Sequence, residues 1–166
     1  MKRLTSFLSG AWVDGEGEGK ALYNPTTGEE VARCSTQSLD LKGALAFARS
    51  QGGATLSKLT FAQRGELLAQ MSQTIHAHRE ELITLGQINA GNTRGDAKFD
   101  IDGASHTLMH YAKLAETLGE ERVLFDGEPE PVARGGRLVG QHILVPRGGV
   151  AIHINAFNFP AWGLAE

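Results

Sequence analysis

The stretch that decides the fold reads His153-Ile154-Asn155-Ala156-Phe157-Asn158-Phe159-Pro160-Ala161-Trp162-Gly163. Residues 150–154, which lead into it, are mostly β-branched and apolar, and this predicts a strand buried on both faces of a parallel sheet. Ligands of α/β proteins bind at the carboxyl ends of such strands. Asn158 can donate its amide to a substrate oxyanion there, or it can satisfy a turn, and the residues alone favour neither role.

The segments just before this stretch are expected to be extended. Residues 123–125, 132–134 and 138–145 have the composition of strands. They are followed by Pro146-Arg147-Gly148-Gly149, which is typical of a turn.

Four helices are expected farther upstream. The first is capped by Ser38 or Asp40 and runs to about residue 49, before the Gly52-Gly53 pair. Thr60 caps the second, the third begins at residues 78–82 and ends near 89–91, and the fourth runs from residue 94 or 96 to 118. Gly119 is placed to end it. The apolar positions that recur at helical spacing are Leu67, Leu68, Met71 and Ile75, then Ile83, Leu85 and Ile88, then Ile101, Leu108, Tyr111 and Leu114.

The first part of the chain predicts short strands. Residues 6–13 are expected to form one strand that ends in a tight turn at Asp14-Gly15. Residues 21–23 and 30–34 flank a turn that contains Asn24-Pro25 and Gly28, and this arrangement predicts a hairpin.

Composition limits the function. The 166 residues are 41% hydrophobic and 21% charged, with a net charge of −3, as in an ordinary soluble domain. The sequence shows no basic cluster for nucleic acid, no apolar run that could span a membrane and no signal peptide. A single cysteine, Cys34, rules out an internal disulfide framework, so a reduced, cytoplasmic location is expected.

Three other candidate sites are weighed against plainer interpretations. His106 and His110 share one helix face, but no third ligand accompanies them, so no metal is expected. Cys34 ends a short strand with no activating base or helix N-terminus predicted beside it, so it is interpreted as structural. The glycine-rich loop at residues 15–19 carries two glutamates that would repel a phosphate.

The last residues are unusually apolar for a chain terminus. Two aromatic residues and a leucine lie within the final eight positions, whereas termini are usually polar and frayed. This predicts that the sequence stops inside a buried region. The alternative is a final segment that docks on its own core.

The stretch at residues 153–163 resembles the Pro-Trp-Asn-Phe-Pro motif of the aldehyde dehydrogenase superfamily. The resemblance covers nearly the whole chain, in order. It includes Gly10-x-Trp12, Asn24-Pro25-x-Thr27-Gly28-Glu29, the helix with Arg64 and Leu67, and Val145-Pro146-x-x-Gly149-Val150.

A departure points to a subgroup, because Ala156-Phe157 stands where most members have Pro-Trp. The sequence resembles two related types that act on CoA-linked semialdehydes. One is the aldehyde dehydrogenase part of the phenylacetate ring-opening fusion protein, and the other is the dehydroadipyl-CoA semialdehyde dehydrogenase of aerobic benzoyl-CoA breakdown. The further segments that carry this resemblance are Ser6-Phe7-Leu8-Ser9-Gly10, Thr93-Arg94-x-Asp96 and Asp100-Ile101-Asp102-Gly103.

The resemblance implies a mechanism. A cysteine thiolate attacks the aldehyde, a hydride passes to NAD or NADP, and a water activated by a glutamate releases the acid. Asn158 matches the family's asparagine whose amide stabilises the oxyanion. The residues that would line the nicotinamide side are Ile154, Asn155, Ala156 and Phe157. The family's nucleophile, glutamate base and adenosine-binding elements lie later and have no counterpart here, and Cys34 does not match the nucleophile.

The resemblance also implies an architecture. The fold class is α/β, the N-terminal part of an aldehyde dehydrogenase fold. Residues 1–120 would form the hairpin and helices of the cofactor-binding domain, residues 121–146 an oligomerisation β-arm, and residues 147–166 the first strand of the dinucleotide-binding sheet. A homodimer or higher homo-oligomer is expected. The alternative function is a truncated, non-catalytic fragment that acts at most as an oligomerisation or pairing module.

Overall fold

The computed structural model describes residues 2–166, and its largest part is a layer of three helices. These are α3 (Phe61–Ala77), α4 (Arg79–Ala90) and α5 (Arg94–Leu118). The predicted boundaries are confirmed. Thr60 caps α3, with its side chain accepting from Gln63 N, and Gly119 ends α5 with a positive φ.

Helices α3 and α5 pack closely because small residues meet between them. A Cβ at Gly65 of α3 would lie 2.7 Å from Ala115 Cβ, so only glycine permits this separation. Ser72 and Ser105 face each other in the same interface, with their buried hydroxyls 3.1 Å apart. Their hydroxyl groups also donate to each other's main-chain oxygens.

The apolar stripes expected from spacing are only partly buried. Ile83 and Ile101 belong to the core together with Ala97, and Leu108 is buried. However, Leu67, Met71, Tyr111 and Leu114 are all more than two-fifths exposed. The face of α5 that packs on α3 carries small side chains instead, because a close helix–helix contact leaves no room for large ones.

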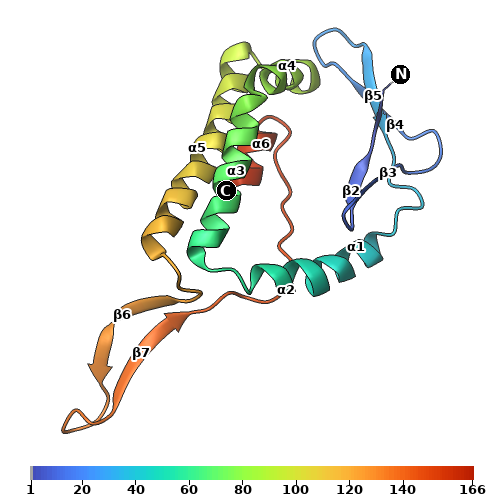
Figure 1. The fold of residues 1–166 in the computed structure, drawn as a ribbon. Coiled ribbons are helices and arrows are strands. Elements are labelled where there is room, and N and C mark those ends of the chain that lie inside the picture. Colours follow the sequence, from blue (N-terminus) through green and yellow to red (C-terminus); the bar gives the residue numbers. More distant parts are fainter. Residues whose placement is uncertain (1) are drawn as a thin grey trace.

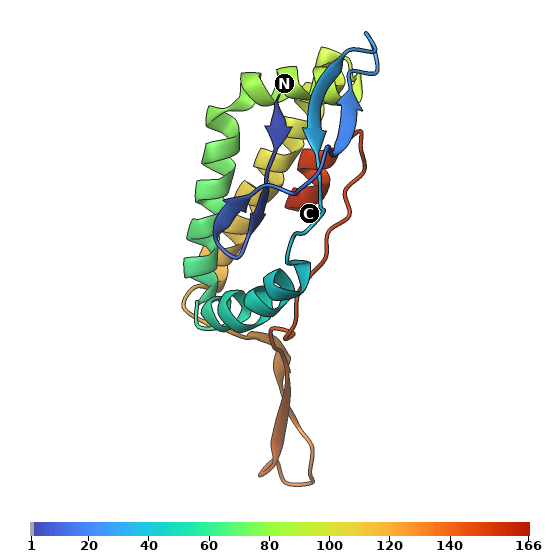
Figure 2. The ribbon, with the colours of Figure 1, turned by 90° about the vertical axis from the view of Figure 1, so that its right-hand side faces the viewer.

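The small strands lie to one side of the helical layer (Figures 1 and 2). Three form a sheet in the order β1-β5-β4, from β1 (Arg3–Leu4), β5 (Glu30–Cys34) and β4 (Lys20–Tyr23). The predicted β4–β5 hairpin is confirmed. The prediction of a single strand at residues 6–13 is wrong. Ser9 and Gly10 take positive φ and turn the chain back, so β2 (Ser6–Leu8) pairs with β3 (Ala11–Val13).

The first helix is longer than predicted. Asp40 caps α1 (Leu41–Phe47), as one of the two expected caps. The helix does not stop at Gly52-Gly53 but passes through a π-helical segment, Ala48–Gly52, into α2 (Gly53–Leu56). Both glycines keep right-handed helical dihedrals, because glycine weakens a helix without forbidding it.

A two-stranded arm projects away from the helices (Figure 1). It consists of β6 (Leu124–Pro131) and β7 (Val139–Leu144), which pair antiparallel. The extended segments predicted at residues 123–125 and 138–145 therefore fall on this arm. Residues 132–134 do not form a separate strand but lie in the connection between the two strands.

The expected strand at residues 150–154 is absent from the structure of residues 2–166. This segment has no regular secondary structure, and Ile152 and Ile154 are 78% and 92% exposed. A parallel strand is stable only when its main-chain groups pair with neighbouring strands, and none of the described strands pairs with it. The chain runs back past α2 and ends in α6 (Pro160–Ala165), which docks on α5 (Figure 1).

Candidate functional site

The loop that carries Asn158 is held by side chains from the α4–α5 region. Asn92, in the turn between these helices, donates its amide to the Asn158 carbonyl at 3.0 Å. Asp100 of α5 accepts from the main-chain N–H groups of Ala161 and Trp162 at 3.2 and 2.8 Å. Main-chain groups on both sides of the Phe159-Pro160 pair are therefore bonded to one helical corner.

Aromatic packing supports the same loop. The Phe99 ring lies edge-to-face against Trp162, with centroids 5.0 Å apart, and against Phe159 at 6.2 Å. Trp162 packs on the α5 backbone at Gly103, where any Cβ would overlap the indole ring. These contacts bury part of α6 and keep its start beside α5.

Three of the predicted cofactor-binding residues meet at one pocket. Ile154, Asn155 and Ala156 line a cavity of about 460 Å³. The rest of its wall consists of Phe99, Phe159, Trp162, Gly163 and Glu166. Phe157 is 82% exposed and Asn158 is exposed, and neither lines this cavity. The pocket presents the Asn155 amide beside the rings of Phe99, Phe159 and Trp162.

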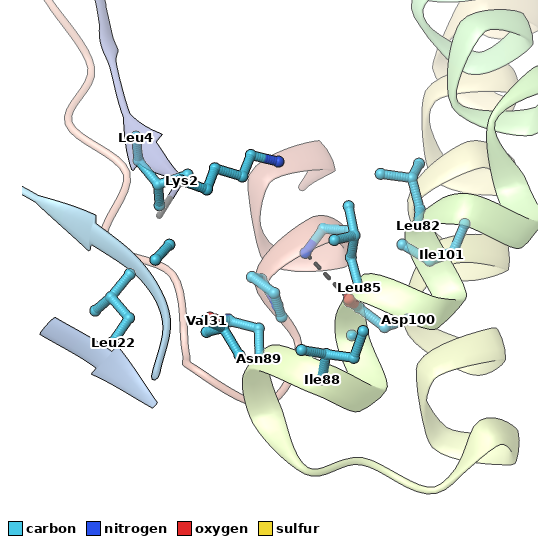
Figure 3. Close-up of a pocket in the computed structure, with 14 residues that line it drawn as sticks. Lys2, Leu4, Leu22, Val31, Leu82, Leu85, Ile88, Asn89, Asp100 and Ile101 are labelled. Atoms are coloured by element: carbon cyan, nitrogen blue, oxygen red, sulfur yellow. Dashed lines mark hydrogen bonds between the residues drawn. The ribbon is translucent and has the colours of Figure 1, made fainter. Parts of the chain in front are cut away.

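A second, larger cleft of about 720 Å³ separates the small sheet from the helices. Figure 3 shows Leu4 and Leu22 on the sheet side facing Leu85 and Ile88 of α4 across it. Asp100 lies at the helical side of this cleft, with its hydrogen bond to the start of α6 drawn as a dashed line. The loop that carries Asn158 is thus anchored at the edge of an apolar cleft.

An ion cluster joins α4 to α5. Arg79 donates two hydrogen bonds to Asp102, at 2.6 and 3.0 Å, and Lys98 adds a third at 2.9 Å. The Arg79 guanidinium, with Lys98, holds the pKa of Asp102 well below its usual range. Arg94 and Glu80 form a further pair at 2.6 Å, and the Arg94 guanidinium lowers the pKa of Glu80. The cluster ties α4 to α5 beside the turn that carries Asn92.

The remaining candidates lie elsewhere. His106 and His110 are on α5, and within residues 2–166 no group of three histidine, cysteine or acidic side chains could hold a metal. Cys34 is a free thiol at the end of β5. No helix of the described residues is long and apolar enough to cross a membrane.

Sequence reasoning missed Asn92 and Asp100, although Asp100 carried a signal. It lies on the buried stripe of α5, between Ala97 and Ile101 and four residues before Ala104, and is 4% exposed. An acidic residue at such a position must receive hydrogen bonds, since burying an unpaired carboxylate is costly. The sequence could have marked Asp100 as an anchor, but it could not show what it anchors.

Known proteins resemble this chain throughout its length. The profile of the aldehyde dehydrogenase family matches residues 12–166. The chain is 44% identical over 164 residues to the 3,4-dehydroadipyl-CoA semialdehyde dehydrogenase of Aromatoleum evansii, covering 99% of this chain and 32% of that protein. It is 27% identical to the betaine aldehyde dehydrogenase of Bacillus subtilis, covering 97% of this chain and 32% of that protein. The chain thus spans about a third of the length of these relatives.

Solved structures share the fold. The NAD-dependent benzaldehyde dehydrogenase of Corynebacterium glutamicum superposes with a TM-score of 0.61 at 20% identity, over 76% of this chain and 27% of that chain. The betaine aldehyde dehydrogenase of Staphylococcus aureus, in complex with NAD+, gives 0.62 at 22%, over 78% and 25%. The α/β class and the expected N-terminal part of the fold are confirmed. The chain belongs to the aldehyde dehydrogenase family.

Proposed function

We propose that this chain is the N-terminal part of an NAD- or NADP-dependent dehydrogenase that oxidises a CoA-linked semialdehyde to the acid. The observation that carries the proposal is the 44% identity over 99% of the chain to a protein named for such a substrate. Within the cytoplasm, the reaction would belong to the aerobic breakdown of an aromatic acid such as phenylacetate or benzoate. The C. glutamicum neighbour is NAD-dependent and the S. aureus neighbour is in complex with NAD+, which supports the cofactor class.

Asn158 is proposed as the catalytic residue within this chain. An aldehyde that is attacked by a thiolate develops negative charge on its oxygen, and an amide N–H held beside that oxygen stabilises it. A fixed donor of this kind contributes about 3 kcal/mol to catalysis in typical cases. The two-sided anchoring of the Asn158 loop supports the role, because a donor is effective only when it is held in place before the reaction.

Ile154, Asn155, Ala156 and Phe157 are proposed to line the nicotinamide side of the cofactor site. When bound, the nicotinamide ring accepts the hydride that the substrate loses. Three of these residues already line one pocket with Phe159 and Trp162. The exposed segment at residues 150–154 would become the first strand of the dinucleotide-binding sheet once further strands pair with it.

The parts of the chain have distinct proposed roles. Residues 1–120 would belong to the cofactor-binding domain, and residues 121–146 would form the oligomerisation arm of a homodimer or higher homo-oligomer. The arm supports this because apolar side chains are exposed along it. They include Phe125, Val132, Leu138, Val139, Ile143 and Leu144. Unpaired strand edges and exposed apolar side chains favour pairing with another chain.

The second candidate is that residues 1–166 alone act as a non-catalytic pairing module. The open apolar cleft between the sheet and the helices favours it, since a surface of this kind attracts other chains. In this case the 166-residue chain is inactive, because Cys34 does not correspond to the family's nucleophile and no other cysteine is present.

An assay of two proteins distinguishes the candidates. One is the 166-residue chain, and the other carries the same residues followed by the family's remaining length. We expect NAD(P)H formation from a CoA-linked semialdehyde only with the longer protein, and slower turnover with the corresponding free aldehyde. Asn158→Ala should lower its kcat by about 100-fold or more. An unchanged kcat would remove the oxyanion role, and turnover by the short chain would contradict the proposed division of the enzyme.

A further inference from the structure

Two side chains outside the motif hold the main chain around Asn158. On one side, Asn92 Nδ2 donates to the Asn158 carbonyl at 3.0 Å. On the other, the two oxygens of Asp100 accept from Ala161 N and Trp162 N. Only Phe159 and Pro160 separate these anchored groups, and the proline ring fixes one further dihedral. The short span leaves the main chain at Asn158 little freedom to rotate.

Asp100 is suited to act as an anchor because it is buried. The residue is 4% exposed, so its carboxylate has little access to water and depends on protein donors. Both of its oxygens receive a main-chain N–H from the first residues of α6. Moving α6 away would remove both main-chain donors and return the carboxylate to water, so these two hydrogen bonds favour the docked position of the loop.

Asn92 is suited to the same task because its turn is rigid. Gly91, just before it, takes the left-handed conformation that ends α4, with its N–H bonded to Gln87 O. Thr93, just after it, caps α5 by accepting from Asp96 N. Asn92 therefore projects from a turn whose main chain is fixed on both sides.

Both anchors belong to one unit. Asn92 lies in the turn just before α5 and Asp100 in the second turn of that helix, and the Arg79–Asp102 and Arg94–Glu80 ion pairs tie α5 to α4. Phe99, next to Asp100, contacts both Phe159 and Trp162. The position of the Asn158 loop therefore depends on the position of the α4–α5 corner.

We propose that Asn92 and Asp100 are positioning residues that fix Asn158 for the reaction, a role that rests on the oxyanion function proposed above. They touch neither substrate nor cofactor and act only through the main chain on the two sides of Asn158. The requirement is strict, because a misplacement of about 1 Å in a catalytic group can lower a rate about 100-fold.

The test is a double-mutant cycle in the longer, active protein, with Asp100→Ala and Asn92→Ala combined with Asn158→Ala. Each anchor variant should lower kcat by about 10-fold or more while Asn158 is present. In the Asn158→Ala background the same changes should have almost no effect, because the donor that they position is gone. Asp100→Asn, which keeps one acceptor oxygen, should restore part of the rate. Asp40→Ala is the matched control, since Asp40 caps the distant helix α1 and should leave kcat unchanged.

A second measurement, of hydrogen exchange, tests the anchoring of the loop separately from its effect on catalysis. Hydrogen exchange of the main chain at residues 157–166 should become at least about 10-fold faster in Asp100→Ala, and unchanged exchange would overturn the anchoring itself. If Asn158→Ala slows turnover but the anchor variants slow it equally with and without Asn158, the positioning role is wrong and the proposed function stands. If Asn158→Ala does not slow turnover, the oxyanion role fails, and the positioning role fails with it.

Discussion

The indole of Trp162 packs directly on the backbone of α5 at Gly103. A Cβ at residue 103 would lie 3.0 Å from Cζ3 of the indole and closer still to two other ring carbons. Gly103 is therefore the position at which α6, and with it the Asn158 loop, rests on α5.

Gly103→Ala should displace α6. Overpacking of this kind costs about 1–3 kcal/mol, and here the displaced element is a short terminal helix. We expect the Trp162 environment to change, measured as a shift and a loss of anisotropy in tryptophan fluorescence with Trp12 replaced by phenylalanine. Gly95→Ala in the same helix is the control, since its Cβ would meet nothing closer than 3.7 Å. An unchanged Trp162 signal in Gly103→Ala would contradict the observed packing.

Gly65→Ala should separate α3 from α5. The added methyl would lie 2.7 Å from Ala115 Cβ and 2.9 Å from the Ala112 carbonyl oxygen, neither of which can move independently of the helix. We expect the free energy of unfolding in urea to fall by about 1–3 kcal/mol. Gly53→Ala, whose helical dihedrals and open surroundings accept a Cβ, should not be destabilising. A stable Gly65→Ala protein would show that the two helices are not in close contact.

Asp102 should make stability depend on acid pH. Its hydrogen bonds to Arg79 and Lys98 lower its pKa in the folded state below the unfolded value of about 3.9. The resulting stability is present above about pH 4 and is lost as pH falls through the lower, folded pKa. Asp102→Asn should therefore lower the thermal unfolding midpoint at neutral pH, with the difference shrinking in acid. Asp126→Asn on the arm is the control. If the difference in unfolding midpoint caused by Asp102→Asn persists unchanged in strong acid, the prediction is contradicted.

Thr60→Ala should weaken the start of α3. The Thr60 side chain accepts from Gln63 N at 3.3 Å, and the Gln63 side chain accepts from Thr60 N at 3.0 Å. Loss of such a cap typically costs about 1 kcal/mol, measured by urea unfolding. Thr60→Ser should retain most of the stability. Thr84→Ala is the control, because it removes an exposed mid-helix hydroxyl that donates to the Glu80 carbonyl, and it should change the free energy of unfolding very little. An equal loss of stability in Thr60→Ala and Thr84→Ala would argue against a special role for the cap.

Features set by neighbouring residues were predictable from the sequence. Thr60 and Gly119 marked helix ends correctly, because a cap satisfies main-chain groups within a few residues. The turn at Asn24-Pro25 likewise placed β4 beside β5. The motif around Asn158 was recognised by resemblance, and the family assignment that it implied is confirmed over residues 12–166.

Features set by distant residues were not predictable. The segment at residues 150–154 has the composition of a buried strand, yet it is exposed, since composition cannot supply the strands that must pair with it. Leu67 and Met71 have helical spacing, but the contact between α3 and α5 is made by Gly65 and Ser72. The anchoring of the Asn158 loop by Asn92 spans 66 residues, and no local pattern reports it.

Asp100 also gives the chain an order of assembly. Its two donors, Ala161 and Trp162, follow it by about sixty residues, so during synthesis α5 leaves the ribosome well before them. Until they arrive, the carboxylate stays in contact with water, because an unpaired charge is costly to bury. The arrival of α6 lets the charge be buried. Docking of α6 therefore completes the surroundings of Asp100 on a helix made much earlier, and it sets the loop that carries Asn158 in place in the same step.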